Sequence, residues 1–237
     1  MPLAIRVVLG VEAFLALAVM AGLAYRERWR TCVSFLAYAL TVVGLGVASI
    51  AWPEAVYTWR AWLVWQTVQV ALKLAVLFEL GTYIFNPFPG ALATMRVVIV
   101  LVLMATAAAL VTLRSSGKDL SDFALQMGPV VNQGAAWGYG LLLALSTWFF
   151  VPMDSWRRAL LTGMAIYGMV FTVAMATLER LGWGAREILS YANMGAYVLL
   201  LGYWNFAAWR AATGDDGQVV RLRHEIALRL AARTERP

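Results

Sequence analysis

The chain has 237 residues, of which 62% are hydrophobic and only 14% are charged. Ordinary soluble domains are about half apolar and about a quarter charged, so this composition excludes that class and predicts an integral membrane protein. The formal net charge of +6 comes largely from arginines between apolar stretches and in the C-terminal tail. Because no basic domain stands apart, the charge predicts contact with anionic lipid headgroups and argues against nucleic-acid binding.

Apolar stretches of membrane length follow one another along the chain. A helix of roughly 20 apolar residues crosses the hydrocarbon core. Breakers such as Pro53, Pro152 and the segment Asn86-Pro87-Phe88-Pro89-Gly90 separate these stretches. We therefore predict an all-α bundle of seven transmembrane helices in one domain, residues 1–213. The seven predicted spans are 3–25, 31–52, 60–85, 91–113, 129–151, 159–181 and 188–209.

Lysines and arginines near the ends of the spans predict the orientation. One side of the predicted bundle, with the tail, collects twelve of them against six on the other side, and without the tail the count is seven against six. Basic residues favour the cytoplasmic side. We expect the N-terminus outside and the C-terminus in the cytoplasm, in a bacterial cytoplasmic membrane. The basic cluster follows the first apolar stretch, so we interpret that stretch as a retained helix and not a signal peptide.

Residues 214–237 form a basic cytoplasmic tail with an amphipathic pattern. An apolar stripe of Val219, Leu222, Ile226 and Leu230 predicts a surface helix over residues 218–232. Such a helix lies on the inner leaflet or docks against a membrane-protein partner. A tryptophan-rich surface of the bundle is a second candidate for partner contact. Another short surface helix is expected outside, over residues 119–127.

The third predicted span carries a polar stripe within an apolar helix. Trp62, Gln66, Gln69 and Lys73 recur at spacings of four, three and four, which places them on one face. An ammonium group near the bilayer centre costs several kcal/mol or more unless it faces protein or a wet cavity. Lys73 is therefore predicted to point inward.

Two interpretations of this polar region remain open. Glu12 in the first span lies at a depth that matches Lys73, and the pair can belong to a structural polar network that joins helices. Alternatively, Lys73 forms the floor of a ligand or ion site with Glu12, Gln66 and Gln69. The outer halves of the fifth and seventh spans add further candidates to that site, namely Asn132, Gln133 and Asn193.

Glu79 and Arg96 form a second candidate pair. Glu79 lies six residues before the end of the third predicted span and Arg96 five residues after the start of the fourth. The turn between the two spans brings both to a similar depth, which predicts a structural ion pair.

Several chemistries are not supported by the residues present. The single histidine and single cysteine argue against His-ligated haem and against a zinc site. No phosphate loop, nucleophile elbow or HExxH motif occurs, so we do not predict an enzyme. In helix number and orientation the chain resembles microbial rhodopsins, whose retinal is held by a lysine in the last helix. Residues 188–209 contain no lysine, so the resemblance does not imply retinal.

Three classes of function remain. The short loops and basic tail favour a sensory or scaffolding protein that acts through partners, and this layout resembles the seven-helix input modules of bacterial signalling proteins. A transporter or channel with Lys73 and Glu12 on its pathway is the alternative. An accessory subunit of a larger membrane complex is the third.

Overall fold

The structure is a computed structural model of the chain. It describes residues 3–56, 58–86, 120–181 and 186–210, with the shorter pieces 90, 92–97, 99–101, 104–105, 108, 184, 221–222 and 225. Every regular element within these residues is helical, which confirms the all-α prediction. The elements are α1 (Leu3–Tyr25), η1 (Trp29–Thr31), α2 (Val33–Ala51), α3 (Pro53–Val56), α4 (Trp59–Phe85), α6 (Leu120–Trp148), α7 (Ser155–Leu181) and α8 (Arg186–Trp209).

Four of the described helices are long and apolar enough to cross a membrane. They contain the stretches Ile5–Tyr25, Val33–Ala51, Leu63–Phe85 and Ser155–Leu178, each of 19 to 24 residues. This supports the prediction of a membrane protein, since roughly 20 apolar residues suffice to span the hydrocarbon core. Helices α6 and α8 occupy two further predicted spans. Much of the predicted span 91–113 lies outside the described residues.

The start of α6 differs from the prediction. Residues 119–127 were expected to form a separate surface helix, with a new span beginning at Pro129. Instead α6 begins at Leu120 and continues through Pro129 to Trp148. A proline removes one backbone donor, and the glycine before it has no Cβ to collide with the proline ring. Gly128 thus relieves one of the clashes that a proline causes inside a helix, and α6 continues past Pro129.

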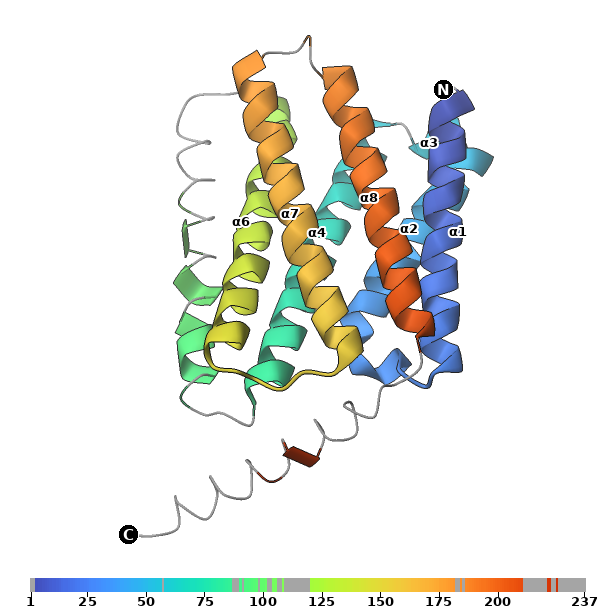
Figure 1. Cartoon of the computed structure of the whole chain (residues 1–237). Coiled ribbons are helices and arrows are strands. Elements are labelled where there is room, and N and C mark those ends of the chain that lie inside the picture. The colour runs from blue at the N-terminus through green and yellow to red at the C-terminus, as the bar shows by residue number, and fades with distance from the viewer. Residues whose placement is uncertain are drawn as a thin grey trace.

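Six helices form a closed ring. Each packs against the next in the order α1, α2, α4, α6, α7 and α8, and α8 packs back against α1. The first and last of these helices thus lie side by side (Figure 1). Met95 and Ile99, from the segment after α4, pack against Gly81 of α4. The ring gives the bundle an interior to which several helices contribute side chains.

Small residues allow two of the helix pairs in this ring to approach closely. A Cβ atom on Gly46 of α2 would lie 2.8 Å from the Cβ of Ala13 on α1. A Cβ atom on Gly168 of α7 would lie 2.5 Å from the Cβ of Ala136 on α6. Such close backbone packing is typical of helices associated in membranes. The hydrophobic effect does not drive helices together in lipid, and small residues let two backbones approach closely enough for strong van der Waals contact.

An aromatic cluster fills one end of the interior. The ring of Phe35 on α2 meets the rings of Trp156 and Trp204 edge to face, with centroid distances of 5.5 and 5.1 Å. The indole N–H of Trp204 donates to the carbonyl of Ala159. All three aromatic side chains are fully buried. This cluster joins α2, α7 and α8.

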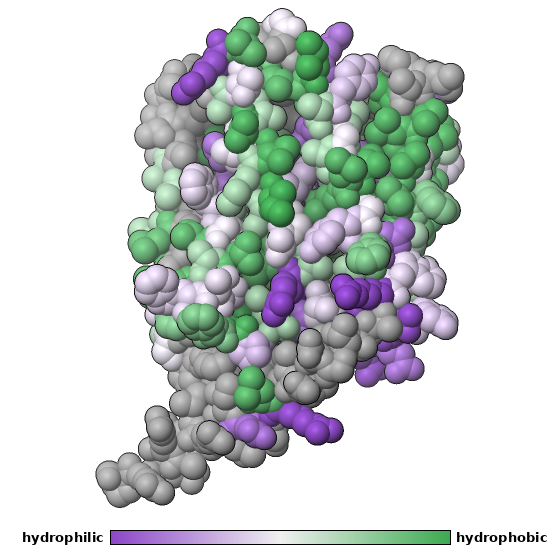
Figure 2. Space-filling model, viewed as in Figure 1, coloured by the Kyte–Doolittle hydropathy of each residue, from purple (hydrophilic) through white to green (hydrophobic). Residues whose placement is uncertain are grey.

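The outward surface of the ring is apolar over a large area. Phe14, Val173, Leu199 and Phe206 are each more than 60% exposed. Figure 2 shows hydrophobic side chains over much of the face formed by α7 and α8, and hydrophilic ones gathered mainly toward the two ends. Exposed apolar surface of this extent is unusual for soluble monomers and suits contact with lipid.

Candidate functional site: a polar centre at Lys73

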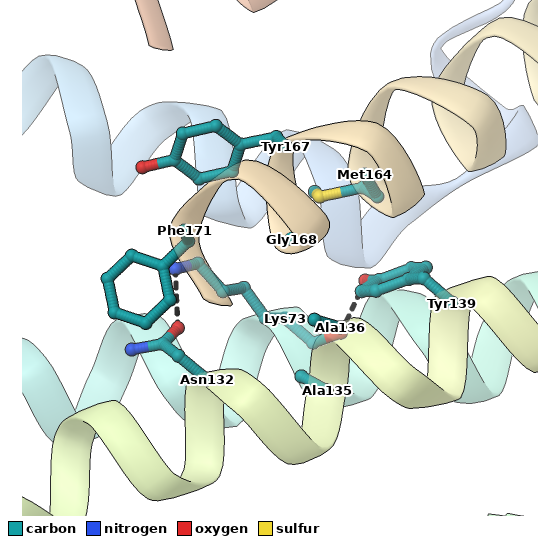
Figure 3. Close-up of a pocket in the computed structure, with 9 residues that line it drawn as sticks. All are labelled: Lys73, Asn132, Ala135, Ala136, Tyr139, Met164, Tyr167, Gly168 and Phe171. Atoms are coloured by element: carbon teal, nitrogen blue, oxygen red, sulfur yellow. Dashed lines mark hydrogen bonds between the residues drawn. The ribbon is translucent and has the colours of Figure 1, made fainter. Parts of the chain in front are cut away.

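Lys73 lies near the middle of α4, with its side chain directed toward α6 and α7 (Figure 3). Its Nζ donates a hydrogen bond of 2.8 Å to Oδ1 of Asn132 on α6. The hydroxyl of Tyr139, also on α6, donates to the backbone carbonyl of Lys73 at 2.6 Å. The prediction that Lys73 points inward is therefore confirmed, and Asn132 is the partner that α6 supplies.

A small cavity adjoins the Lys73 side chain. Its volume is about 20 Å³, which is room for about one water molecule. The small residues Ala135, Ala136 and Gly168 leave this space between α6 and α7, and Phe171 lines another side. The remaining lining residues are Lys73, Asn132, Tyr139, Met164 and Tyr167.

Buried tyrosines extend this polar centre across the ring. The hydroxyls of Tyr38 on α2 and Tyr197 on α8 share a hydrogen bond of 2.9 Å. The ring of Tyr197 also packs against that of Tyr167 on α7, with centroids 5.3 Å apart. Because Tyr167 lines the Lys73 cavity, polar groups from α2, α4, α6, α7 and α8 lie in one connected region.

Glu12 belongs to this region but does not pair with Lys73. It lies on α1, within electrostatic range of Tyr38, Tyr167 and Tyr197. Among the described residues no ion pair joins it to Lys73, whose ammonium bonds Asn132 instead. The two side chains are directed to different neighbours, because α1 packs on α2 and α8, whereas Lys73 faces α6 and α7.

The remaining predicted site residues are not part of the cavity lining. Gln66 and Gln69 lie on α4 in the turns before Lys73, and Gln133 follows Asn132 on α6; all three are partly buried. Asn193 has a buried Oδ1 without a hydrogen-bond partner in the described structure. Of the tail stripe, Val219, Ile226 and Leu230 lie outside the described residues, and Leu222 is exposed.

The predicted Glu79–Arg96 ion pair is also wrong. Both residues are described, and Arg96 is exposed. The Glu79 carboxylate accepts hydrogen bonds of 2.9 Å from the backbone N–H groups of Val33 and Ser34, and one from the Cys32 thiol. The N–H groups at a helix start carry partial positive charge and attract a carboxylate. The Glu79 carboxylate therefore binds the start of α2 and not the guanidinium of Arg96.

Near Glu79, a buried arginine ties α7 to its neighbours. Arg157 pairs with Asp154, donates to the carbonyl of Thr31 at 3.2 Å, and lies 3.3 Å from the ring centroid of Tyr83. Asp154 also accepts from the backbone N–H of Arg157. This cluster lies at one end of the bundle and has a structural role, because the Arg157 guanidinium contacts both Tyr83 of α4 and Thr31 of the α1–α2 connection.

Sequence reasoning did not identify the tyrosines or Arg157. Tyrosine in an apolar span looks like an ordinary core or interfacial aromatic residue. A usable signal is that a buried tyrosine hydroxyl needs a hydrogen-bond partner. Another is the Asp154–Arg157 spacing of three at the start of a helix, which permits both a cap and an ion pair.

In the part of the chain that the structure describes, these features define an all-helical fold with four membrane-length apolar helices and a polar centre inside a ring of helices. Comparison of the chain with protein-family models, curated proteins and solved structures found no match.

Proposed function

We propose that the protein is a seven-span membrane protein that acts through partners, as a sensory, scaffolding or accessory subunit, and that the Lys73 centre is its functional site. The observation that carries this proposal is the ammonium of Lys73, held by a neutral amide beside a cavity of about 20 Å³. That volume is far below the roughly 300–1,000 Å³ of ordinary ligand pockets. A centre of this size suits a change of state within the bundle better than passage of a solute.

Placement of a charged side chain in the bundle interior supports a functional role for Lys73. Intramembrane ionisable groups are costly and mark functional sites by default. A purely packed interior at this position would need only an apolar side chain. The arginines at the end of the bundle where α1 and α8 finish support contact of that end with anionic headgroups of the bacterial cytoplasmic membrane, with the N-terminus outside.

Purification from native membranes tests this proposal. Wild-type protein and the Lys73→Met variant are extracted in a mild detergent, and the proteins that remain bound are quantified by mass spectrometry. We expect a stoichiometric membrane-protein partner with the wild type, and a changed amount of it with the folded variant. A wild-type protein that carries only lipid, or a partner unaffected by Lys73→Met, would contradict the proposal.

A small-ion pathway is the second candidate, and the position of Glu12 favours it. Glu12 and Lys73 lie at opposite parts of the same polar region, connected through Tyr197 and Tyr167. A series of hydroxyl and carboxyl groups that lie next to one another in space can relay protons. Reconstituted vesicles with an enclosed pH-sensitive dye test this. Under this candidate Glu12→Gln abolishes proton flux, whereas Glu54→Gln, at an exposed position of α3, leaves it intact.

A further inference from the structure

Lys73 carries a positive charge without a carboxylate in contact. Among the described residues, Glu79 is engaged by the start of α2, Asp154 pairs with Arg157, and Glu12 lies by the tyrosines. The partner of the ammonium is instead the neutral amide of Asn132. A charge taken out of water into a low-dielectric interior costs several kcal/mol, unless it is paired with an opposite charge.

The cavity offers room for that opposite charge. An ammonium has three N–H donors, and one of them is used by Asn132. The space of about 20 Å³ lies beside the same side chain and is lined by Ala135, Ala136 and Gly168. It admits one particle about as large as a water molecule.

We propose that this cavity binds a single monatomic anion, chloride, as the counter-ion of Lys73. The ion contacts the Lys73 ammonium, and the hydroxyl-bearing Tyr167 forms part of the same wall. The proposal rests on the assignment of Lys73 as the functional centre and names the ligand of that centre. A bound anion makes the state of the bundle depend on anion concentration, which a water molecule in the same place does not.

Thermal unfolding of the purified protein in detergent tests the site without any partner. Melting temperatures are measured in sodium chloride, sodium bromide and sodium gluconate at equal ionic strength, because gluconate is a much larger anion than either halide. At a chloride concentration about 100 times Kd, the Tm should rise by roughly 5–10 °C over gluconate. The rise should saturate with chloride, and bromide should act similarly.

Two variants and a control locate the effect. Lys73→Met removes the positive charge, and the dependence on chloride should disappear. Asn132→Asp places a fixed carboxylate where the amide oxygen now lies 2.8 Å from Nζ. This variant should also lose the chloride effect and unfold at a higher temperature in gluconate than the wild type. Lys118→Met changes the only other lysine, in a predicted loop, and should respond like the wild type.

Equal wild-type melting temperatures in chloride and gluconate would overturn the anion site. A chloride effect that persists in Asn132→Asp would overturn it as well, even if Lys73→Met fails to fold. If chloride has no effect but Lys73→Met still alters partner binding, the anion site fails while the proposed function stands. If chloride stabilises the wild type through Lys73 and no partner is found, the anion site stands while the proposed function fails.

Discussion

The carboxylate of Glu79 on α4 accepts a hydrogen bond of 2.9 Å from the backbone N–H of Ser34 in the first turn of α2. Helix starts are usually capped by the side chain of the residue that precedes the helix. In α2 that residue is Cys32, which forms no such cap. The cap is therefore supplied by another helix. The Glu79 carboxylate provides acceptors for the backbone N–H groups at the start of α2, and the same contact fixes α4 beside α2.

Glu79→Ala should destabilise the protein. Loss of a cap costs about 0.5–2 kcal/mol, and hydrogen bonds to a charged group are worth about 1.5–3 kcal/mol each. We expect a total loss of about 2–3 kcal/mol, since water reaches part of this site. Thermal unfolding in detergent measures it, with Glu54→Ala at an exposed position as the matched control. An unchanged Tm for Glu79→Ala would contradict the cross-helix cap.

Arg157→Met should also lower stability, whereas the adjacent substitution Arg158→Met should not. Arg157 is buried and contacts Asp154, Thr31 and Tyr83, while Arg158 is exposed. Breaking a buried ion pair costs about 3–5 kcal/mol. We expect Arg157→Met to lose about 3 kcal/mol of unfolding free energy, the lower end of this range, because Asp154 keeps its hydrogen bond to the backbone N–H of residue 157. Exposed substitutions change stability by about 0.5 kcal/mol or less.

Equilibrium unfolding of both variants against the wild type measures this difference. Arg157→Lys adds a further comparison. Lysine keeps the charge but lacks the planar group that stacks on Tyr83, so it should recover only part of the loss. Equal stabilities for the Met variants at positions 157 and 158 would show that the buried cluster is not a stabilising contact.

Gly168→Ala and Gly195→Ala should have opposite effects. A Cβ on Gly168 would lie 2.5 Å from the Cβ of Ala136, whereas one on Gly195 meets no atom within 4 Å. Overpacking costs about 1–3 kcal/mol. Alanine in an open helical position gains up to about 1 kcal/mol over glycine. The sign of the difference in Tm between the two variants tests whether α6 and α7 are in contact at Gly168.

The hydroxyls of Tyr38 and Tyr197 should be energetically coupled. Tyr38→Phe leaves the buried Tyr197 hydroxyl without its 2.9 Å partner, which costs about 1–3 kcal/mol. Removing both hydroxyls relieves that unpaired group, so the double variant should be less destabilised than the sum of the single variants. Unfolding free energies of the four proteins give the coupling. Additive losses would mean that the two hydroxyls do not interact.

Some of the site followed from the sequence and some did not. The spacing of Gln66, Gln69 and Lys73 placed Lys73 on an inward face of a helix, because helical periodicity determines which residues share a face. Asn132 was a candidate for the same region, and the structure brings it to Lys73. Matched depth alone did not identify the partners of Glu12 and Glu79. Helix α1 is not next to α4 in the ring, and Arg96 is exposed although its neighbours Met95 and Ile99 pack against α4.

The sequence by itself determined that the chain is helical, apolar and divided into membrane-length segments, and that Lys73 must be sheltered. These properties depend on local composition and on the cost of exposing charge or backbone to lipid. Only the tertiary structure decided which helices adjoin in the ring, and so which partner each polar side chain meets. Lys73 therefore bonds an amide beside a water-sized cavity, and Glu79 caps α2, because helix order in space is a property of the whole bundle.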